Sequence, residues 1–221
     1  MDIKKINIAV DGTASSGKSS VMEVVAKKLD LHMIDTGLMY RAYTKLCLDN
    51  NVNFLNENEI IEQLKNFKCH YGENNSIFVN DKDFTSYVAQ YDVAENIKYV
   101  ASVSKVREKM VELQREMASD GGKIMVGRDI TTVVLPDADL KIYFDCSAQA
   151  RAKRRFLQNE KNNILPNDYE DILRQIVQRD EWDKKREVGA LKIAKDAWFF
   201  DTSDLNFEQA VDAVVNKIEN L

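Results

Sequence analysis

Residues 12–20 have the composition and spacing of a loop that binds phosphate groups. They read Gly-Thr-Ala-Ser-Ser-Gly-Lys-Ser-Ser and match the pattern G-x-x-x-x-G-K-S. Small residues let the backbone curl, so that its N–H groups converge on phosphate oxygens at a helix N-terminus. Lys18 would reach the β and γ phosphates, and the Ser19 hydroxyl would complete a Mg²⁺ shell. The alternative is a strand-to-helix turn without a ligand. The pattern favours a nucleoside triphosphate bound by Gly12, Thr13, Ala14, Ser15, Ser16, Gly17, Lys18, Ser19 and Ser20.

Arginines are the second group that could do chemistry. A guanidinium group binds phosphate through two parallel hydrogen bonds, so several of them would suit a second phosphorylated molecule. Any single one is better explained as a surface residue. Seven lie near predicted strand ends or on flanking helices: Arg41, Arg107, Arg128, Arg151, Arg154, Arg179 and Arg186.

One predicted helix changes character along its length. Ile172, Ile176, Arg179, Asp183 and Arg186 are spaced by four, three, four and three residues, so they share one face. That face begins apolar and ends charged, which is consistent with a helix that runs from the core into a cleft. A solvated helix end with an Arg179–Asp183 ion pair is the simpler interpretation from spacing alone.

Short apolar runs alternate with longer helical patterns along the chain, which predicts an α/β fold with a mainly parallel sheet. The apolar run before the phosphate loop predicts a buried strand, and a helix follows the loop to residue 29. Residues 50–100 interrupt the alternation and are expected to form an inserted lobe, with short strands at 67–71 and 76–79. Residues 158–168 are polar and suit an exposed loop. We also predict strands at 31–35, 124–126, 140–145 and 197–201, and helices at 38–48, 106–117, 168–187 and 207–218.

Composition excludes several classes of protein. The chain has 221 residues, 44% of them hydrophobic and 30% charged, and a formal net charge of −5, so we expect no general attraction to nucleic acid or membrane. No apolar run approaches the roughly 20 residues that a membrane span needs, and we expect a cytoplasmic protein. Three widely spaced cysteines predict neither disulfides nor a zinc site. His32 and His70 stand alone, which argues against a histidine metal cluster.

Several motifs together resemble bacterial cytidylate kinases, from residue 6 to about 203. The resemblance implies a P-loop NTPase-type three-layer fold in one kinase domain, 1–221, with a core of about 1–49 and 101–221. It also implies a nucleoside monophosphate lobe at about 50–100 and a mobile lid at about 151–168. The motifs are the phosphate loop, Asp-Thr-Gly at 35–37 with Met-Tyr-Arg at 39–41, Val-Arg at 106–107, Gly-Arg-Asp-Ile at 127–130, the segment 132–138, Arg179, Asp183 and Arg186, and the segments 196–197 and 201–203.

The resemblance also implies residue roles. Arg41, Arg128 and Arg186 are expected to clamp the acceptor phosphate. Arg107 and Asp129 are expected to read the cytosine edge, Arg179 and Asp183 to contact the ribose, and Thr36 to lie at the acceptor site. Arg154 is expected to cross from the lid to the donor phosphates. This chain departs from the family pattern at Lys98, at 87–89, at Thr131 and at Ala190.

The implied reaction is transfer of the γ-phosphoryl group of ATP to CMP or dCMP with Mg²⁺, in a monomer. Lys18, Arg128, Asp129, Arg154 and Arg186 are the expected catalytic residues, Ser19 the metal ligand, and Asp11 and Asp129 candidates to orient the metal's waters. One alternative is a kinase of the same architecture with UMP or a non-nucleotide acceptor. The other is a GTP-dependent switch, but we find neither the N-K-x-D nor the D-x-x-G element that it would need.

Overall fold

The computed structural model describes residues 2–185 and 189–221, which form two compact units. The first unit comprises residues 1–32 and 121–221, and the second comprises residues 33–120. The predicted lobe at 50–100 falls inside the second unit, which begins earlier and ends later in the chain.

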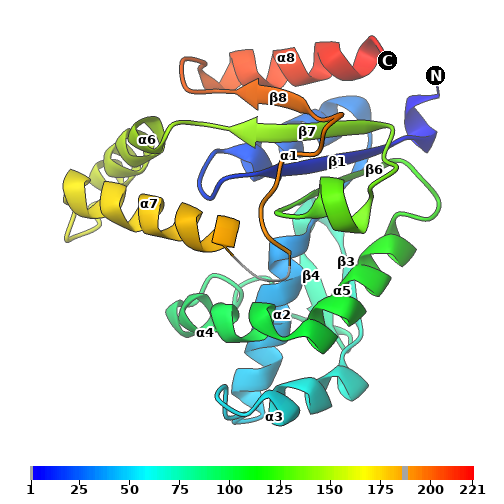
Figure 1. The fold of residues 1–221 in the computed structure, drawn as a ribbon, viewed down its shortest axis with the longest axis vertical. Helices are drawn as coiled ribbons and strands as arrows, with labels where there is room; N and C mark the ends of the chain where they lie inside the picture. The colour runs from blue at the N-terminus through cyan, green and yellow to red at the C-terminus, as the bar shows by residue number, and fades with distance from the viewer. Residues whose placement is uncertain (1, 186–188) are drawn as a thin grey trace. The chain divides into compact units, whose positions relative to one another are not determined.

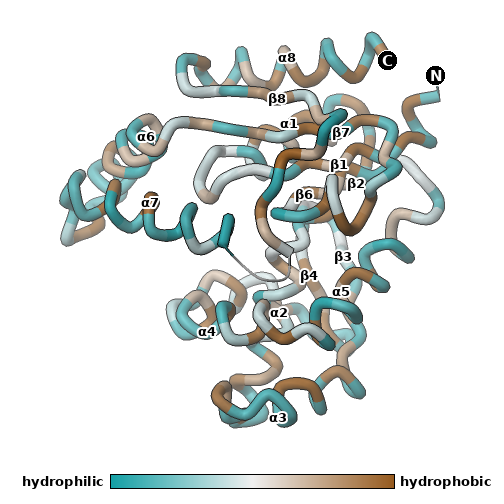
Figure 2. The backbone as a smooth tube through the Cα atoms, viewed as in Figure 1, coloured by the Kyte–Doolittle hydropathy of each residue, from teal (hydrophilic) through white to brown (hydrophobic). Residues whose placement is uncertain are grey.

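A five-stranded sheet has the order β2-β6-β1-β7-β8 (Figure 1), and four of its strands form the centre of the first unit, whereas residues 33–35 of β2 belong to the second unit. Its strands are β1 (Asn7–Gly12), β2 (His32–Asp35), β6 (Lys123–Gly127), β7 (Leu140–Asp145) and β8 (Trp198–Asp201). β1 runs parallel to β6 and β7, and β8 runs parallel to β7. β1 and β6 carry hydrophobic runs (Figure 2) and are buried almost throughout. The predicted α/β fold with a parallel sheet is therefore confirmed.

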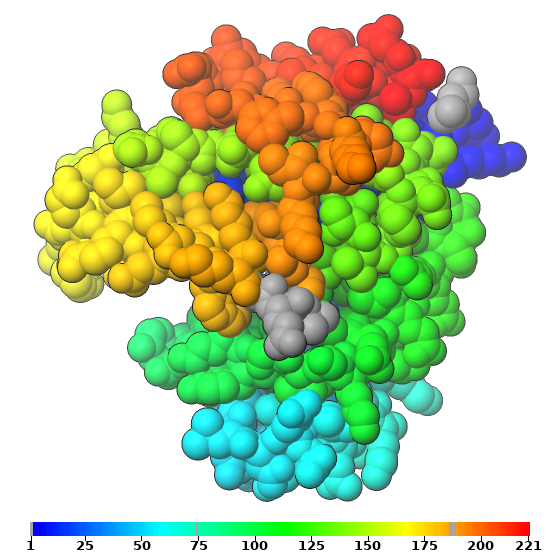
Figure 3. Space-filling model, viewed as in Figure 1, coloured from blue at the N-terminus to red at the C-terminus, as the bar shows by residue number. Residues whose placement is uncertain are grey.

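Four α-helices, among the residues that the structure describes, accompany this sheet: α1 (Lys18–Leu29), α6 (Ala148–Lys161), α7 (Tyr169–Lys185) and α8 (Phe207–Glu219). α1 packs against α8, which begins at the capping box formed by Asn206 and Gln209. α6 and α7 lie side by side (Figure 3) around a small apolar core. The 3-10 helix η1 (Ile3–Lys5) precedes β1, and the π-helical segment η4 (Ile130–Val134) follows β6.

The loop predicted at 158–168 is wrong in its first four positions. α6 continues to Lys161, because Asn162 closes the helix by donating its backbone N–H to carbonyls of the last turn. The helix predicted at 168–187 corresponds to α7, and its last two positions lie outside the described residues.

The second unit packs helices against a small antiparallel sheet of order β3-β4-β5. Its largest fully buried side chains are Tyr43, Met39, Ile60, Ile77 and Met110. The predicted strands at 67–71 and 76–79 appear as β3 and β4, whereas α4 and β5 were not predicted. The elements are α2 (Thr36–Asp49), α3 (Glu57–Glu62), η2 (Gln63–Asn66), β3 (Cys69–Tyr71), η3 (Glu73–Asn75), β4 (Ile77–Val79), β5 (Lys82–Asp83), α4 (Tyr91–Ser102) and α5 (Ser104–Met117).

The cysteines are free thiols, as the sequence predicted. Burial raises the pKa of Cys47 and of Cys69 to about 12, so both remain protonated at neutral pH. Within residues 2–185 and 189–221, no helix is both long enough and apolar enough to span a bilayer.

Candidate active site

The phosphate loop joins the end of β1 to the start of α1, as its sequence predicted. Gly12 lies so close to β7 that a Cβ atom there would come within 2.1 Å of the backbone oxygen of Phe144. Gly17 has a φ of +88° at the N-cap of α1, a conformation that favours glycine. Both glycines are therefore required by the backbone. Lys18 begins the helix, is buried, and donates from Nζ to the Thr13 carbonyl oxygen at 3.1 Å.

The hydroxyl of Ser16 shows that this loop suits an anion. Ser16 is only 1% exposed, and its Oγ has no hydrogen-bond partner among the residues that the structure describes. A buried hydroxyl without a partner costs about 1–3 kcal/mol, and a bound phosphate oxygen would remove that cost. Neighbouring backbone N–H groups at the N-terminus of α1 add a partial positive charge. The loop is therefore built to bind the phosphate groups of a nucleotide.

The loop also suits Mg²⁺ in the manner of a nucleotide-bound ion. In the described part of the chain, no group of three His, Cys, Asp or Glu side chains could hold a metal ion by itself. Mg²⁺ commonly keeps several waters and takes one or two protein ligands together with phosphate oxygens. The half-buried Ser19, in the first turn of α1, fits as one such ligand.

Asp183 connects two of the predicted acceptor-site arginines. Its carboxylate accepts a hydrogen bond from Arg128 Nε at 2.9 Å and lies 3.6 Å from Arg179 Nε. Asp183 is 1% exposed, and its backbone oxygen accepts from Leu191 N at 2.9 Å. Arg128 follows β6, whereas the other two residues lie on α7. The buried carboxylate therefore fixes the direction of a guanidinium group from a different element.

Asp129 is buried and lies between Arg128 and the start of η4. The turn that carries both residues is attached to β1 through Asp11, which accepts hydrogen bonds from Ile130 N at 2.8 Å and from Thr131 N at 2.8 Å. Burial is the main reason that the pKa of Asp11 rises to about 6. Three hydrogen bonds from protein donors reach the two Asp11 oxygens, and the expectation that this residue orients metal-bound water stays a prediction.

Arg151, which the sequence analysis named among the seven arginines without giving it a role, contacts the phosphate loop. It is 3% exposed and donates from Nη1 to the Ala14 carbonyl oxygen at 3.0 Å. It also donates from Nε to the Cys146 oxygen at 2.8 Å. Its two terminal nitrogens bind the Asp180 carboxylate at 3.1 Å and 2.5 Å. Arg151 thus ties the phosphate loop to α6 and α7.

Arg154 lies against a different segment of the first unit. Its Nη2 donates to the backbone oxygens of Thr202 at 2.6 Å and Leu205 at 3.2 Å. Its Nη1 lies 3.2 Å from Cys146 Sγ. Contact with donor phosphates would require this side chain to leave those carbonyls, so the role expected for Arg154 stays a prediction.

Three predicted site residues belong to the second unit. Thr36 is buried at the first position of α2, after Asp35, whose carboxylate accepts from Gly37 N at 2.9 Å. Arg41 donates from Nη1 to the Val88 oxygen at 3.1 Å. The buried Arg107 places its guanidinium 5.7 Å from the centre of the Tyr40 ring.

The roles expected for these three residues stay predictions. Arg186, the third residue of the predicted acceptor clamp beside Arg41 and Arg128, lies outside the described residues.

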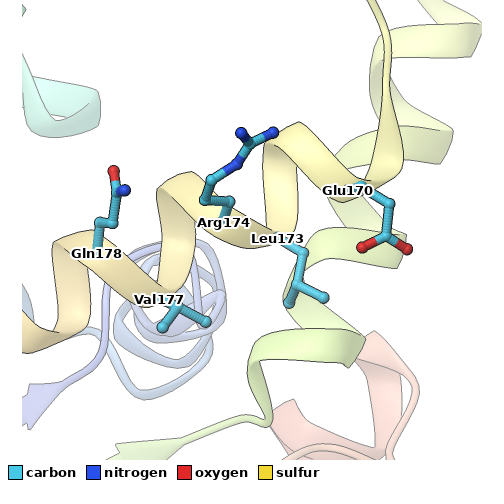
Figure 4. Close-up of a pocket in the computed structure, with 5 residues that line it drawn as sticks. All are labelled: Glu170, Leu173, Arg174, Val177 and Gln178. Carbon is cyan, nitrogen blue, oxygen red and sulfur yellow. The ribbon is translucent and has the colours of Figure 1, made fainter.

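A hollow of about 380 Å³ on the surface of α7 contains none of the predicted site residues. It is lined by Glu170, Leu173, Arg174, Val177 and Gln178, all from this one helix (Figure 4). No residue of the phosphate loop lines it, so it does not enter the assignment of the active site.

Nearly the whole chain is similar in sequence to known proteins of one family. Residues 8–220 match the family described as Cytidylate kinase. A cytidylate kinase from Mesoplasma florum is 47% identical over 218 residues, which cover 99% of this chain and 98% of that protein. One from Mycoplasma capricolum is 44% identical over 219 residues, with the same two coverages.

A solved structure shares the fold at much lower sequence identity. An uncharacterized protein from Eubacterium ventriosum aligns with a TM-score of 0.54 and 12% identity, over 98% of this chain and 100% of that one.

Proposed function

Because this chain belongs to the cytidylate kinase family, we propose that it transfers the γ-phosphoryl group of ATP to CMP, forming ADP and CDP. The observation that carries the proposal is the family match over residues 8–220, which includes the phosphate loop and the Arg128–Asp129 turn. The acceptor oxygen of CMP is already ionised at neutral pH, so the reaction needs no strong general base. Catalysis then depends on positioning the two phosphates and on neutralising their charge.

The phosphate loop is proposed to hold the donor. Its backbone N–H groups and the Ser16 hydroxyl bind phosphate oxygens of ATP, and the Lys18 ammonium group neutralises charge on the β and γ phosphates. The Ser19 hydroxyl would hold Mg²⁺, which would supply charge neutralisation to the donor phosphates. Arg151 keeps the loop in place through the Ala14 carbonyl.

The arginines are proposed to hold the acceptor. Arg41, Arg128 and Arg186 bind the phosphate of CMP, and Arg107 and Asp129 bind the cytosine edge. Arg179 and Asp183 contact the ribose, and Thr36 lies beside the acceptor. The Asp183 carboxylate supports this arrangement because it holds Arg128 Nε at 2.9 Å. A group held by a buried partner loses less entropy when a ligand binds.

Two further expectations belong to the proposal. We propose that dCMP is also accepted, and that the lid residue Arg154 crosses to the donor phosphates of ATP when the segment 151–168 closes. Closure would exclude water from the reacting phosphoryl group. A monomeric state stays a prediction.

An acceptor panel tests the proposal. Purified protein with ATP and Mg²⁺ is given CMP, dCMP, UMP, AMP or shikimate in turn, and ADP release is followed by a coupled assay. We expect the highest kcat/KM with CMP, and substantial turnover with dCMP. A higher kcat/KM with UMP, AMP or shikimate would refute the assignment of the acceptor.

A further inference from the structure

Asp11 is a buried carboxylate without a role in the reaction described above. It lies next to the last residue of β1, is 0% exposed, and is paired in register with Gly127 of β6 and Tyr143 of β7. Three hydrogen bonds reach its two oxygens. Ile130 N donates to Oδ1 at 2.8 Å, whereas Thr131 donates to Oδ2 from its backbone N at 2.8 Å and from Oγ1 at 2.6 Å.

These bonds hold the backbone directly after two proposed acceptor-site residues. Arg128 and Asp129 immediately precede Ile130, so the position of the two bound amides fixes the end of the turn from which both side chains project. Asp11 itself leads into Gly12 and the phosphate loop. One carboxylate therefore connects the start of the donor loop to the end of the acceptor turn.

Burying the ionised Asp11 carboxylate costs free energy, which indicates that its connection between the donor loop and the acceptor turn has a function. The pKa of Asp11 is raised to about 6, mainly by desolvation and to a smaller extent by the nearby Asp129 carboxylate, while the three hydrogen bonds oppose the rise. Tyr143 of β7, paired in register with Asp11, is a further titratable group, and its own pKa is raised to about 12 mainly by burial. Of the effects that keep Asp11 ionised, the Thr131 side-chain hydrogen bond is the largest.

We propose that Asp11, together with the Thr131 hydroxyl, is a positioning pair that sets the geometry of Arg128 and Asp129 for the acceptor nucleotide. The inference rests on the proposed function, since the acceptor is a pyrimidine nucleoside monophosphate. The ionised carboxylate accepts all three hydrogen bonds. A protonated carboxyl group becomes a donor at one oxygen and opposes an N–H or O–H there, so acceptor binding weakens as the pH falls through the Asp11 titration.

The test is Thr131→Val, which removes the hydroxyl and keeps the shape of the side chain. Thr132→Val is the matched control: it makes the same change one residue later, at a half-buried hydroxyl that makes no hydrogen bond to Asp11. We expect Thr131→Val to raise KM for CMP by roughly three- to tenfold, the range for the loss of one ordinary hydrogen bond, because the two backbone hydrogen bonds to Asp11 remain. KM for ATP should stay within about twofold, and Thr131→Ser, which keeps a hydroxyl, should restore KM for CMP.

The pH profile supplies a readout that a purely structural role would not move. Without the Thr131 hydroxyl, the pKa of Asp11 rises further, so the acidic limb of kcat/KM for CMP should move to higher pH by roughly 0.5–1 unit. The CMP phosphate also titrates near pH 6, but it contributes equally to every variant. A ¹³C NMR titration of the aspartate carboxyl groups, with Asp11→Asn to assign the signal, reports the same shift independently of activity.

The possible outcomes distinguish the positioning role of Asp11 and Thr131 from the proposed phosphorylation of CMP. If the wild-type protein turns over CMP but Thr131→Val matches Thr132→Val in KM for CMP and in its acidic limb, the positioning pair is overturned and the proposed function stands. If the wild-type protein does not phosphorylate CMP, the proposed function itself is overturned. The positioning pair is supported if Thr131→Val, but not Thr132→Val, shifts both the acidic limb of kcat/KM for CMP and the ¹³C titration of Asp11.

Discussion

Replacing Asp183 by asparagine should weaken acceptor binding, while the protein remains folded. The substitution keeps the shape of the side chain and one acceptor oxygen, and removes the negative charge that Arg128 and Arg179 share. Arg128 Nε would then face an amide that binds it less strongly, and the guanidinium group would sample other directions. We therefore expect KM for CMP to rise more than KM for ATP.

The magnitude follows from the two contacts of the carboxylate. The Arg128 bond is 2.9 Å long, with the arginine side chain 23% exposed, and a hydrogen bond to a charged group is worth about 1.5–3 kcal/mol. The Arg179 pair is 3.6 Å long, with that side chain 43% exposed, so it adds only about 0–1 kcal/mol. Because asparagine keeps one acceptor, we expect a loss of about 2 kcal/mol, or roughly 30-fold in kcat/KM for CMP.

Steady-state kinetics, with CMP and ATP varied in turn, measure the effect on acceptor binding. Urea unfolding measures the effect on stability. Glu181→Gln is the matched control, since this residue lies on the same helix and forms an exposed pair with Lys185 at 3.2 Å. The control should change kcat/KM and stability by less than about 0.5 kcal/mol. If Asp183→Asn behaves like Glu181→Gln in kcat/KM for CMP, Asp183 does not orient Arg128 for the acceptor and the reasoning fails.

Three other substitutions test the supports of the phosphate loop and the pH dependence of stability. Arg151→Lys loses the bidentate contact with Asp180 and should raise KM for ATP by roughly tenfold, measured with CMP saturating; an unchanged KM would remove Arg151 as a support of the loop. Gly12→Ala forces a Cβ against the Phe144 carbonyl oxygen and should destabilise the protein by about 1–3 kcal/mol in urea unfolding, whereas a stability equal to that of the wild type would contradict the close approach. The pKa of Asp11 is raised from 3.8 to about 6, so its folded form binds a proton more tightly and its contribution to stability falls as pH rises from about 4 to about 6. The unfolding free energy of the wild type relative to Asp11→Asn should fall over that interval and stay level above it; a flat difference would show that the Asp11 pKa is not raised.

The part of the site that lies in one continuous segment could be predicted from the sequence. Glycines and small residues at fixed spacing define the phosphate loop, and the apolar strand before it is read directly from hydrophobicity. β6 and β7 were predicted for the same reason, because buried strands are continuous apolar runs. The helix α4 was not predicted, although Val93, Ile97, Val100 and Ala101 recur at helical spacing, so the signal for it is present in the sequence.

The supports of the site could not be predicted, because each joins residues that are distant in the sequence. Arg151 and Asp180 are 29 positions apart, and Asp11 and Thr131 are 120 apart. Nothing in the basic pattern of α6 separates the buried Arg151 from its neighbours. The structure distinguishes Arg151 from the other basic residues of α6, because the fold determines which of these side chains is buried against the phosphate loop.

Transfer of ³²P from [γ-³²P]ATP to CMP, measured side by side for the wild type and for Lys18→Ala, tests the central claim most directly. Lys18 is the proposed charge on the donor phosphates, so its removal should lower kcat by roughly 10²–10³-fold while circular dichroism shows an intact fold. The account predicts labelled CDP from the wild type and almost none from the variant. Equal labelling by the two proteins, or no labelled CDP from the wild type, would contradict it.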